Sequence, residues 1–162
     1  MIRYCPHCWA KNKYEALTCA ACGASLDERD KDFVARLIDA IQHPEPTAAA
    51  LAIEILGRLA EPRAVDALLI RLARNPDSMD VTAATATALG HIGERRAVPG
   101  LAEVLLDNKR PLPTRLAAAE ALAMLDSSDA EEALRAVLNR PRIPILLRQV
   151  AELVAAKDAS IP

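Results

Sequence analysis

The sequence predicts an all-α protein, a solenoid of stacked helix pairs that follows a small cysteine-rich module. Three observations support this fold class. Leucines recur at a fixed interval of 33 residues, and self-similarity at such a period is typical of stacked repeats. No aromatic residue follows Phe33, so the rest of the chain relies on alanine, leucine, valine and isoleucine, of which alanine and leucine are strong helix formers. All four cysteines lie before Gly23.

The repeat consists of three leucine columns and one column of small residues. Each repeat unit is too small to bury its own apolar face, so neighbouring units must stack to form a continuous core. The columns are Leu56, Leu89 and Leu122; Leu68, Leu101 and Leu134; Leu72, Leu105 and Leu138; and Gly57, Gly90 and Ala123.

The bulk composition indicates a globular chain with little net charge. Of the 162 residues 52% are hydrophobic and 26% charged, and the formal net charge is −2. No basic stripe is large enough to predict binding to duplex nucleic acid. The N-terminus has no apolar signal region, and no stretch reaches about 18 uncharged apolar residues. We therefore expect a soluble cytoplasmic protein that does not bind membranes, in a compartment where cysteines favour metal or redox roles.

The four cysteines form two Cys-x-x-Cys pairs, Cys5 with Cys8 and Cys19 with Cys22. A two-residue gap lets both thiolates of a pair face one metal from a tight turn, which Pro6 favours in the first pair. Four thiolates at this spacing predict a closed, tetrahedral Zn²⁺ site.

Other chemistries of these four residues stay open at this point. Two disulfides or a thioredoxin-like redox pair would use the same cysteines, although no βαβ pattern surrounds either pair. Iron also binds four thiolates. His7 lies between two ligands and would have to fold back into its own turn to coordinate, so we expect an exposed ring.

Residues 4–26, YCPHCWAKNKYEALTCAACGASL, resemble the short bacterial zinc ribbon. Asn12, Ala16, Gly23 and Leu26 occupy positions that the family pattern expects, whereas Trp9 replaces a glycine and Thr18 an aromatic residue. The resemblance implies a zinc-dependent folding unit at residues 1–26 that serves folding, protein docking or nucleic-acid contact.

Apolar periodicity and proline punctuation predict eight helices after the ribbon. A single helix over 31–42 starts the stack and a single helix over 145–156 ends it. Between them lie three pairs joined by short loops, which is the usual connection between antiparallel helices. The pairs are 47–59 with 63–74, 81–92 with 96–106, and 114–125 with 129–138.

The segment ALGHIGERRAVPGLAEVL at 88–105, echoed by ILGRLAEPRAVDALLIRL at 55–72, resembles the short HEAT-like repeat first named from phycobilisome lyases. The family's Val-Arg arginine is present as Arg115 but is Thr82 and Ala49 in the other units. The resemblance covers residues 31–157. It implies a right-handed α-α superhelix with about three helix pairs and flanking half-repeats, which we assign to a domain at 27–160.

We expect no catalytic activity. His43 and His91 are the only histidines besides His7, and no serine or free cysteine comes with a plausible base. The five glycines are scattered rather than gathered in a phosphate-binding loop. The lyase chemistry of the family's first members is not expected either, because fold does not carry function and this body has no aromatic residues for a chromophore.

The resemblance implies that the second helix of each pair lines the partner-binding face. The 33-residue shift predicts the outward positions of those helices, and the resulting surface has mixed charge and small apolar spots suited to a peptide or helix. We predict partner contacts at Asp66, Ile70, Arg71, Arg74, Glu103, Val104, Asp107, Val137 and Arg140. The denser basic spots, Arg95-Arg96 and Arg140-Pro141-Arg142, are interpreted as solvated loops.

The sequence thus predicts a non-catalytic protein–protein interaction scaffold with a structural zinc site. The alternative is a nucleic-acid-associated accessory protein that contacts DNA or RNA through the ribbon. Its candidate residues combine a weak basic patch with interleaved aromatic rings, as single-strand binding requires. They are Arg3, Lys11, Lys13, Trp9 and Tyr14.

Overall fold

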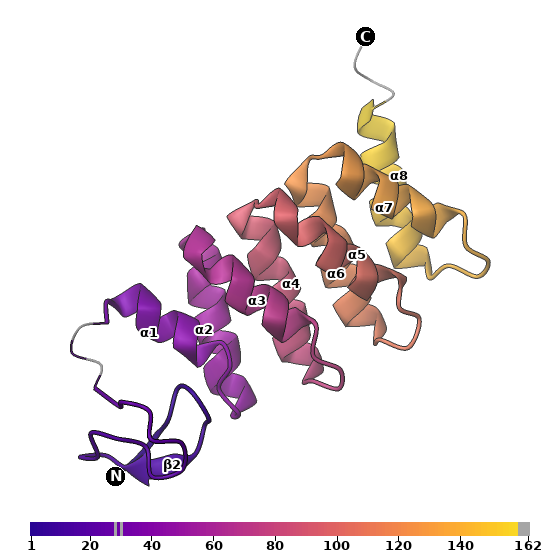
Figure 1. Cartoon of the computed structure of the whole chain (residues 1–162). Helices are drawn as coiled ribbons and strands as arrows, with labels where there is room; N and C mark the ends of the chain where they lie inside the picture. Colours follow the sequence, from indigo (N-terminus) through magenta and orange to yellow (C-terminus); the bar gives the residue numbers. More distant parts are fainter. Residues whose placement is uncertain (28, 30, 159–162) are drawn as a thin grey trace.

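The computed structural model describes residues 1–27, 29 and 31–158 and contains a small β-hairpin module followed by a helical stack. Figure 1 shows the helices in two rows. Helices α1, α3, α5 and α7 form the first row, and α2, α4, α6 and α8 form the second row behind it. The termini lie at opposite ends of the stack, with the hairpin module beside α1 and α2. The fold class predicted from the sequence is confirmed.

The N-terminal module is built on strands β1 (Ile2–Tyr4) and β2 (Lys11–Lys13). The strands are antiparallel, with Arg3 opposite Asn12, and an isolated bridge joins Thr18 to Ser25. Its buried residues are Cys5, Cys19 and Leu26. So small an apolar core indicates that the module needs another source of folding free energy.

The helical stack follows the predicted helices closely. Each observed helix begins and ends within two residues of its predicted bounds. The helices are α1 (Phe33–Ala40), α2 (Pro46–Arg58), α3 (Val65–Leu72), α4 (Met79–Ile92), α5 (Val98–Leu106), α6 (Leu112–Leu125), α7 (Ser128–Leu138) and α8 (Ile145–Asp158). Short 3₁₀ turns at Pro62–Ala64 and Arg95–Ala97 lead into α3 and α5, which accounts for the later start of these two helices.

Side-chain caps fix several helix starts. The Asp32 carboxylate accepts a hydrogen bond from the backbone N–H of Ala35, which satisfies one of the free N–H groups at the start of α1. This bond, and to a smaller extent a hydrogen bond from the Arg63 guanidinium, lowers the pKa of Asp32. Glu45 caps α2 in the same way through the N–H groups of Thr47 and Ala48. Asp32, just after the N-terminal module, thus caps the helix with which the stack begins.

The leucine columns form the core. Leu56, Leu89 and Leu122 are at most 1% exposed, and so are Leu68, Leu101, Leu134, Leu72 and Leu105; Leu138, near the end of the stack, is partly buried. Within the second row α4 packs on both α2 and α6, while α3 packs on α4 and α5 on α6. Each leucine thus lies between neighbouring repeats, as the periodicity predicts.

The column of small residues sets the distance between helices of the second row. A Cβ atom added at Gly57 would lie 2.9 Å from the Cα of Ala88, and one added at Gly90 would lie 2.8 Å from the Cα of Ala121. Neither distance is tolerated between non-bonded carbon atoms. The glycines therefore allow α2, α4 and α6 to approach more closely than any side chain would permit.

Candidate metal centre and partner surface

Two matching turns present the four cysteines. In the first turn the Trp9 N–H donates to the Cys5 carbonyl at 2.8 Å. In the second turn the Gly23 N–H donates to the Cys19 carbonyl at 2.9 Å. The residue after each second cysteine is in the left-handed region, with φ of 59° at Trp9 and 71° at Gly23. The two Cys-x-x-Cys pairs therefore have the same backbone shape and face each other.

The four sulfur atoms form one compact cluster. All four lie within 4.8 Å of one another, with Sγ–Sγ distances of 3.7 Å from Cys5 to Cys22 and 3.6 Å from Cys8 to Cys19. Four thiolates at about 2.3 Å from a tetrahedral ion would have sulfurs about 3.8 Å apart. The distances greatly exceed the S–S bond of about 2.05 Å, and all four cysteines are free. The spacing therefore fits metal ligands rather than disulfides.

Asn12 connects the two turns beneath the cluster. Its side-chain amide donates to the Ala10 carbonyl at 2.8 Å and to Cys19 Sγ at 3.5 Å, while its oxygen accepts from the Ala20 N–H at 2.9 Å. Asn12 is only 7% exposed. Sequence reasoning noted Asn12 only as a position in the ribbon pattern. Its three hydrogen bonds hold both turns in register around the sulfurs.

The surroundings of the cluster shift the pKa values of Cys19 and Cys8 in opposite directions. The backbone N–H of Cys22 is the largest influence that lowers the pKa of Cys19, to about 6. The backbone of Ala10 acts on Cys8 in the same direction, but the Cys22 thiol and burial outweigh it and raise the pKa of Cys8 to about 12. Four thiolates this close repel one another, so a bound cation is needed to keep all of them deprotonated.

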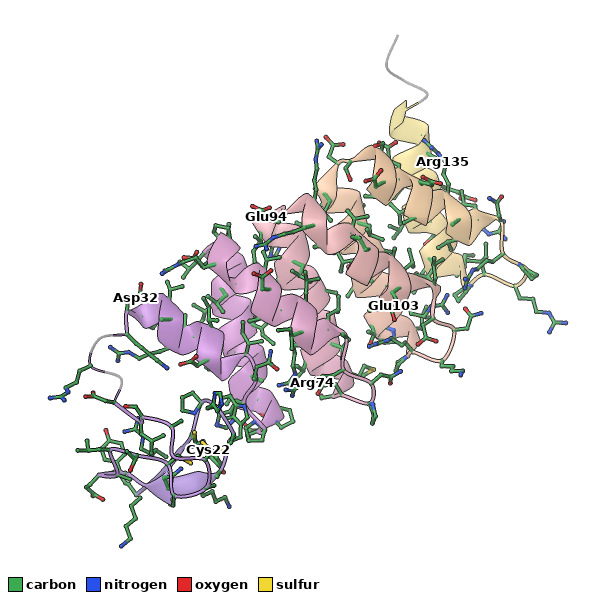
Figure 2. All side chains as sticks on the ribbon, viewed as in Figure 1. Cys22, Asp32, Arg74, Glu94, Glu103 and Arg135 are labelled. Carbon is green, nitrogen blue, oxygen red and sulfur yellow. The ribbon has the colours of Figure 1, made fainter. Side chains whose placement is uncertain are left out.

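His7 lies outside the sulfur cluster. Its side chain is exposed, and its backbone N–H, at 3.4 Å, approaches Cys5 Sγ. Figure 2 shows the sulfur atoms near Cys22 on the side of the module toward the solenoid.

Three aromatic rings join the module to the loop between α1 and α2. His43, in the loop between α1 and α2, lies 4.9 Å from the Tyr4 ring and 5.1 Å from the Trp9 ring, edge to face with both. Edge-to-face packing at these distances is favourable. Trp9, which replaces the usual glycine despite its positive φ, therefore supplies a contact between the module and the solenoid.

The residues proposed for nucleic-acid contact differ in exposure, and Arg3 is partly exposed with its guanidinium donating to the Leu26 carbonyl. Lys11, Lys13 and Tyr14 are exposed at and just after β2. The Trp9 ring is partly exposed and packs edge to face against His43, which leaves less of the ring for base stacking; its role in nucleic-acid contact stays a prediction.

The predicted partner surface is exposed at only some of its positions. Asp66, Ile70, Arg74 and Glu103 are exposed, and Asp107 and Arg140 are partly exposed. Figure 2 shows Arg74 and Glu103 toward the same edge of the first row. Val104 and Val137 are 2% and 1% exposed, so the prediction that they face outward is wrong. Their helices, α5 and α7, pack on each other as well as on the second row, which widens the buried face beyond the predicted stripe.

Arg71 is likewise buried, at 3% exposed, and the prediction that it faces a partner is wrong. Its guanidinium forms a bidentate ion pair with Asp77, with Nε–Oδ2 at 2.5 Å and Nη2–Oδ1 at 3.1 Å. Nη1 also donates to the carbonyls of Ile41 and His43, at 2.9 and 3.1 Å. The long side chain reaches back to the preceding repeat, where it caps the carboxyl end of α1.

Comparison with known families decides the class of this chain. The family model for HEAT repeats matches residues 69–155, which is more than half of the 162 residues. The chain is a HEAT-repeat protein. No curated protein matches its sequence.

Among solved structures, this HEAT-repeat protein is similar to a chain in the complex of CpcE and CpcF of phycocyanin lyase from Nostoc sp. PCC7120. The two chains are 26% identical, with a TM-score of 0.64. The match covers 84% of this HEAT-repeat protein but 58% of the other chain, so a large part of that chain has no counterpart here. The lyase-type HEAT resemblance is thereby supported for the helical part.

Within residues 1–27, 29 and 31–158, the HEAT-repeat protein has no helix long and apolar enough to cross a membrane.

Proposed function

We propose that this HEAT-repeat protein is a non-catalytic scaffold for a protein partner, with a structural Zn²⁺ ion in its N-terminal zinc ribbon. The observation that carries the metal assignment is the cluster of four cysteine sulfurs at tetrahedral spacing. Four thiolates with no open position suit Zn²⁺ in a structural role. Cysteines that bind a metal rather than form disulfides fit a reducing compartment, and we assign the protein to the cytoplasm on that ground.

The ion would supply folding free energy that the small apolar core of the module does not provide. Cys5, Cys8, Cys19 and Cys22 would hold it, and Asn12 and the backbone N–H of His7 would orient two of the sulfurs. Binding of Zn²⁺ to four thiolates releases protons and contributes folding free energy, which small zinc domains require. The aromatic contact with His43 would then hold the folded ribbon on the loop between α1 and α2.

The assignment of a protein partner is supported by the family and by the exposed face of α3 and α5. HEAT solenoids present extended surfaces. The similar structure is that of a complex of two proteins, CpcE and CpcF of phycocyanin lyase. On this chain Ile70 is 63% exposed between the charged residues Asp66 and Arg74, and Glu103 extends the surface to α5. An apolar centre with charged flanks suits a helical or extended peptide.

Removal of the metal should unfold the ribbon and leave the helices standing. Addition of a strong chelator is expected to shift the fluorescence of Trp9, the only tryptophan, to longer wavelength as its contact with His43 is lost. Far-UV circular dichroism should keep most of its helical signal, because the core of the stack contains no residue of the ribbon. Collapse of the helical signal together with zinc loss would contradict the two-module proposal.

Charge and polarity changes on α3 should weaken capture of the partner. In an affinity pull-down analysed by mass spectrometry, Ile70→Asp with Arg74→Glu is expected to lose proteins that the parent chain retains. A matched control is Leu51→Asp with Arg58→Glu on α2, where Leu51 is 58% exposed, close to the value for Ile70. Equal loss in both double variants would contradict the α3 surface.

The nucleic-acid alternative predicts a different result. It requires retention of the parent chain on heparin at moderate salt, and loss of that retention when Lys11 and Lys13, exposed on β2, are changed to glutamate.

A further inference from the structure

Arginines cap the carboxyl ends of first-row helices at more than one level of the stack. At α1 the cap is Arg71, and Asp77 neutralises its charge through the bidentate pair. At Arg71, therefore, a buried guanidinium that donates to helix carbonyls is paired with one carboxylate of the chain.

At α5 the same kind of cap has no such carboxylate. Arg115, on α6, donates from Nε to the Leu105 carbonyl at 2.9 Å, and Arg140 donates from Nη1 to the Leu106 carbonyl at 2.5 Å. Arg115 is only 8% exposed. Among the described residues, no carboxylate lies within ion-pair distance of either arginine. Each guanidinium carries five N–H donors in a fixed fork, and these two carbonyl bonds use one donor of each.

An open cavity of about 530 Å³ adjoins these two guanidiniums. Its lining includes a third arginine, Arg142, together with Asn108 and the apolar side chains of Val137 and Ile143. No acidic residue lines it among the residues that the structure describes. Arg140 and Arg142 belong to the loop after α7, which the sequence suggested was merely solvated, and Arg115 reaches the same cavity from α6, the first helix of that pair.

The positive charges of Arg115 and Arg140 lie close enough to repel each other. Burial lowers the pKa of Arg115, the nearby charge of Arg140 lowers it further, and Asp107 opposes both. Asp107 itself lies 3.7 Å from Arg110, so its charge is shared with another guanidinium. A desolvated cation beside like charges is costly unless an anion neutralises it.

We propose that this cavity is a binding site for a phosphate group, held by Arg115, Arg140 and Arg142. One carboxylate balances one guanidinium at Arg71, so three guanidiniums call for an anion with more charge and more acceptor oxygens. A phosphate dianion supplies both, and arginine forks match its oxygens in pairs. The volume leaves room for an organic group attached to the phosphate, and the partly exposed Ile143 provides apolar contact for it.

Titration with inorganic phosphate, followed by NMR of the arginine Nε–Hε groups, tests the site. The full-length metal-loaded chain is used at constant ionic strength, above the second pKa of phosphate. Signals of Arg115, Arg140 and Arg142 should shift and saturate, and acetate should bind more weakly. Arg140→Gln with Arg142→Gln should reduce the association constant about tenfold or more, since both changes remove charge-assisted bonds to the phosphate oxygens.

A matched control changes the other basic pair, Arg95→Gln with Arg96→Gln, and should leave phosphate binding unaltered. The single variant Arg142→Gln, at an exposed position, should still weaken binding if the double variant does not fold. Glycerol 3-phosphate and a phosphoserine peptide then distinguish a small metabolite from a phosphoprotein, by which of them binds more tightly than inorganic phosphate. Shifts that spread without saturation over all exposed arginines, or equal loss in the control pair, would overturn the proposal.

Discussion

Substitution of Arg71 by methionine is expected to destabilise the folded chain by about 3–5 kcal/mol, the usual cost of removing one partner of a buried ion pair. The variant would leave the Asp77 carboxylate, whose side chain is 11% exposed, without its guanidinium. It would also remove the donor to the carbonyls of Ile41 and His43 at the end of α1. The long apolar stem of methionine fills part of the space, so the effect reports mainly on the lost charge and hydrogen bonds.

Urea denaturation followed by circular dichroism measures this loss as a lower midpoint at an unchanged slope. The exposed neighbour Arg74→Met is the control and should stay within about 0.5 kcal/mol of the parent. The double variant Arg71→Met with Asp77→Asn should recover part of the stability, because no uncompensated charge is left. Equal midpoints for Arg71→Met and Arg74→Met would show that Arg71 is a surface residue, as the sequence first suggested.

Gly90→Ala is expected to destabilise the stack by about 1–3 kcal/mol, the range for overpacking a close-packed interior. In an ordinary helix the same change is stabilising by about 1 kcal/mol, so the sign of the effect is diagnostic. Here the new methyl group would lie 2.8 Å from the Cα of Ala121, and backbone can yield only if α4 and α6 move apart. Because α6 also packs on α5 and α8, such a movement disturbs the centre of the solenoid.

Gly100→Ala is the matched control for Gly90→Ala in thermal and urea unfolding. Gly100 also lies inside a helix, but its added methyl group would meet only the mobile ends of Leu69 and Leu72, at 3.2 and 3.5 Å. We expect Gly100→Ala to be neutral or stabilising by up to about 1 kcal/mol. A stabilised Gly90→Ala variant would contradict the close approach of α4 to α6.

The periodic part of the molecule could be predicted because one physical rule repeats along it. Stacking requires an apolar residue at each contact between repeats, so the leucine columns identified the core, and apolar periodicity with proline positions identified the eight helices. The clustering of the four cysteine sulfurs could be predicted for a related reason, since metal ligation fixes both the residue type and the spacing of its ligands. In both cases a local sequence pattern carries the constraint.

Contacts in which a side chain extends to another repeat or to the N-terminal module could not be predicted. The 33-residue shift gave Arg71, Val104 and Val137 the same outward position, yet all three are buried. A column count fixes the direction of a Cβ but not how far a long side chain extends, and Arg71 extends to the end of α1. The role of Trp9 was equally hidden, because its partner His43 is distant in the sequence.

The central claim is a HEAT solenoid that carries one structural metal ion in its ribbon, and the mass of the intact folded chain tests it most directly. Native mass spectrometry of protein purified without added metal should show one Zn²⁺ per chain. The ion should be lost on acidification, which protonates the four thiolates, and in a ligand variant such as Cys19→Ser. A chain whose mass instead corresponds to two disulfides, to bound iron, or to four free thiols with no metal would contradict the account.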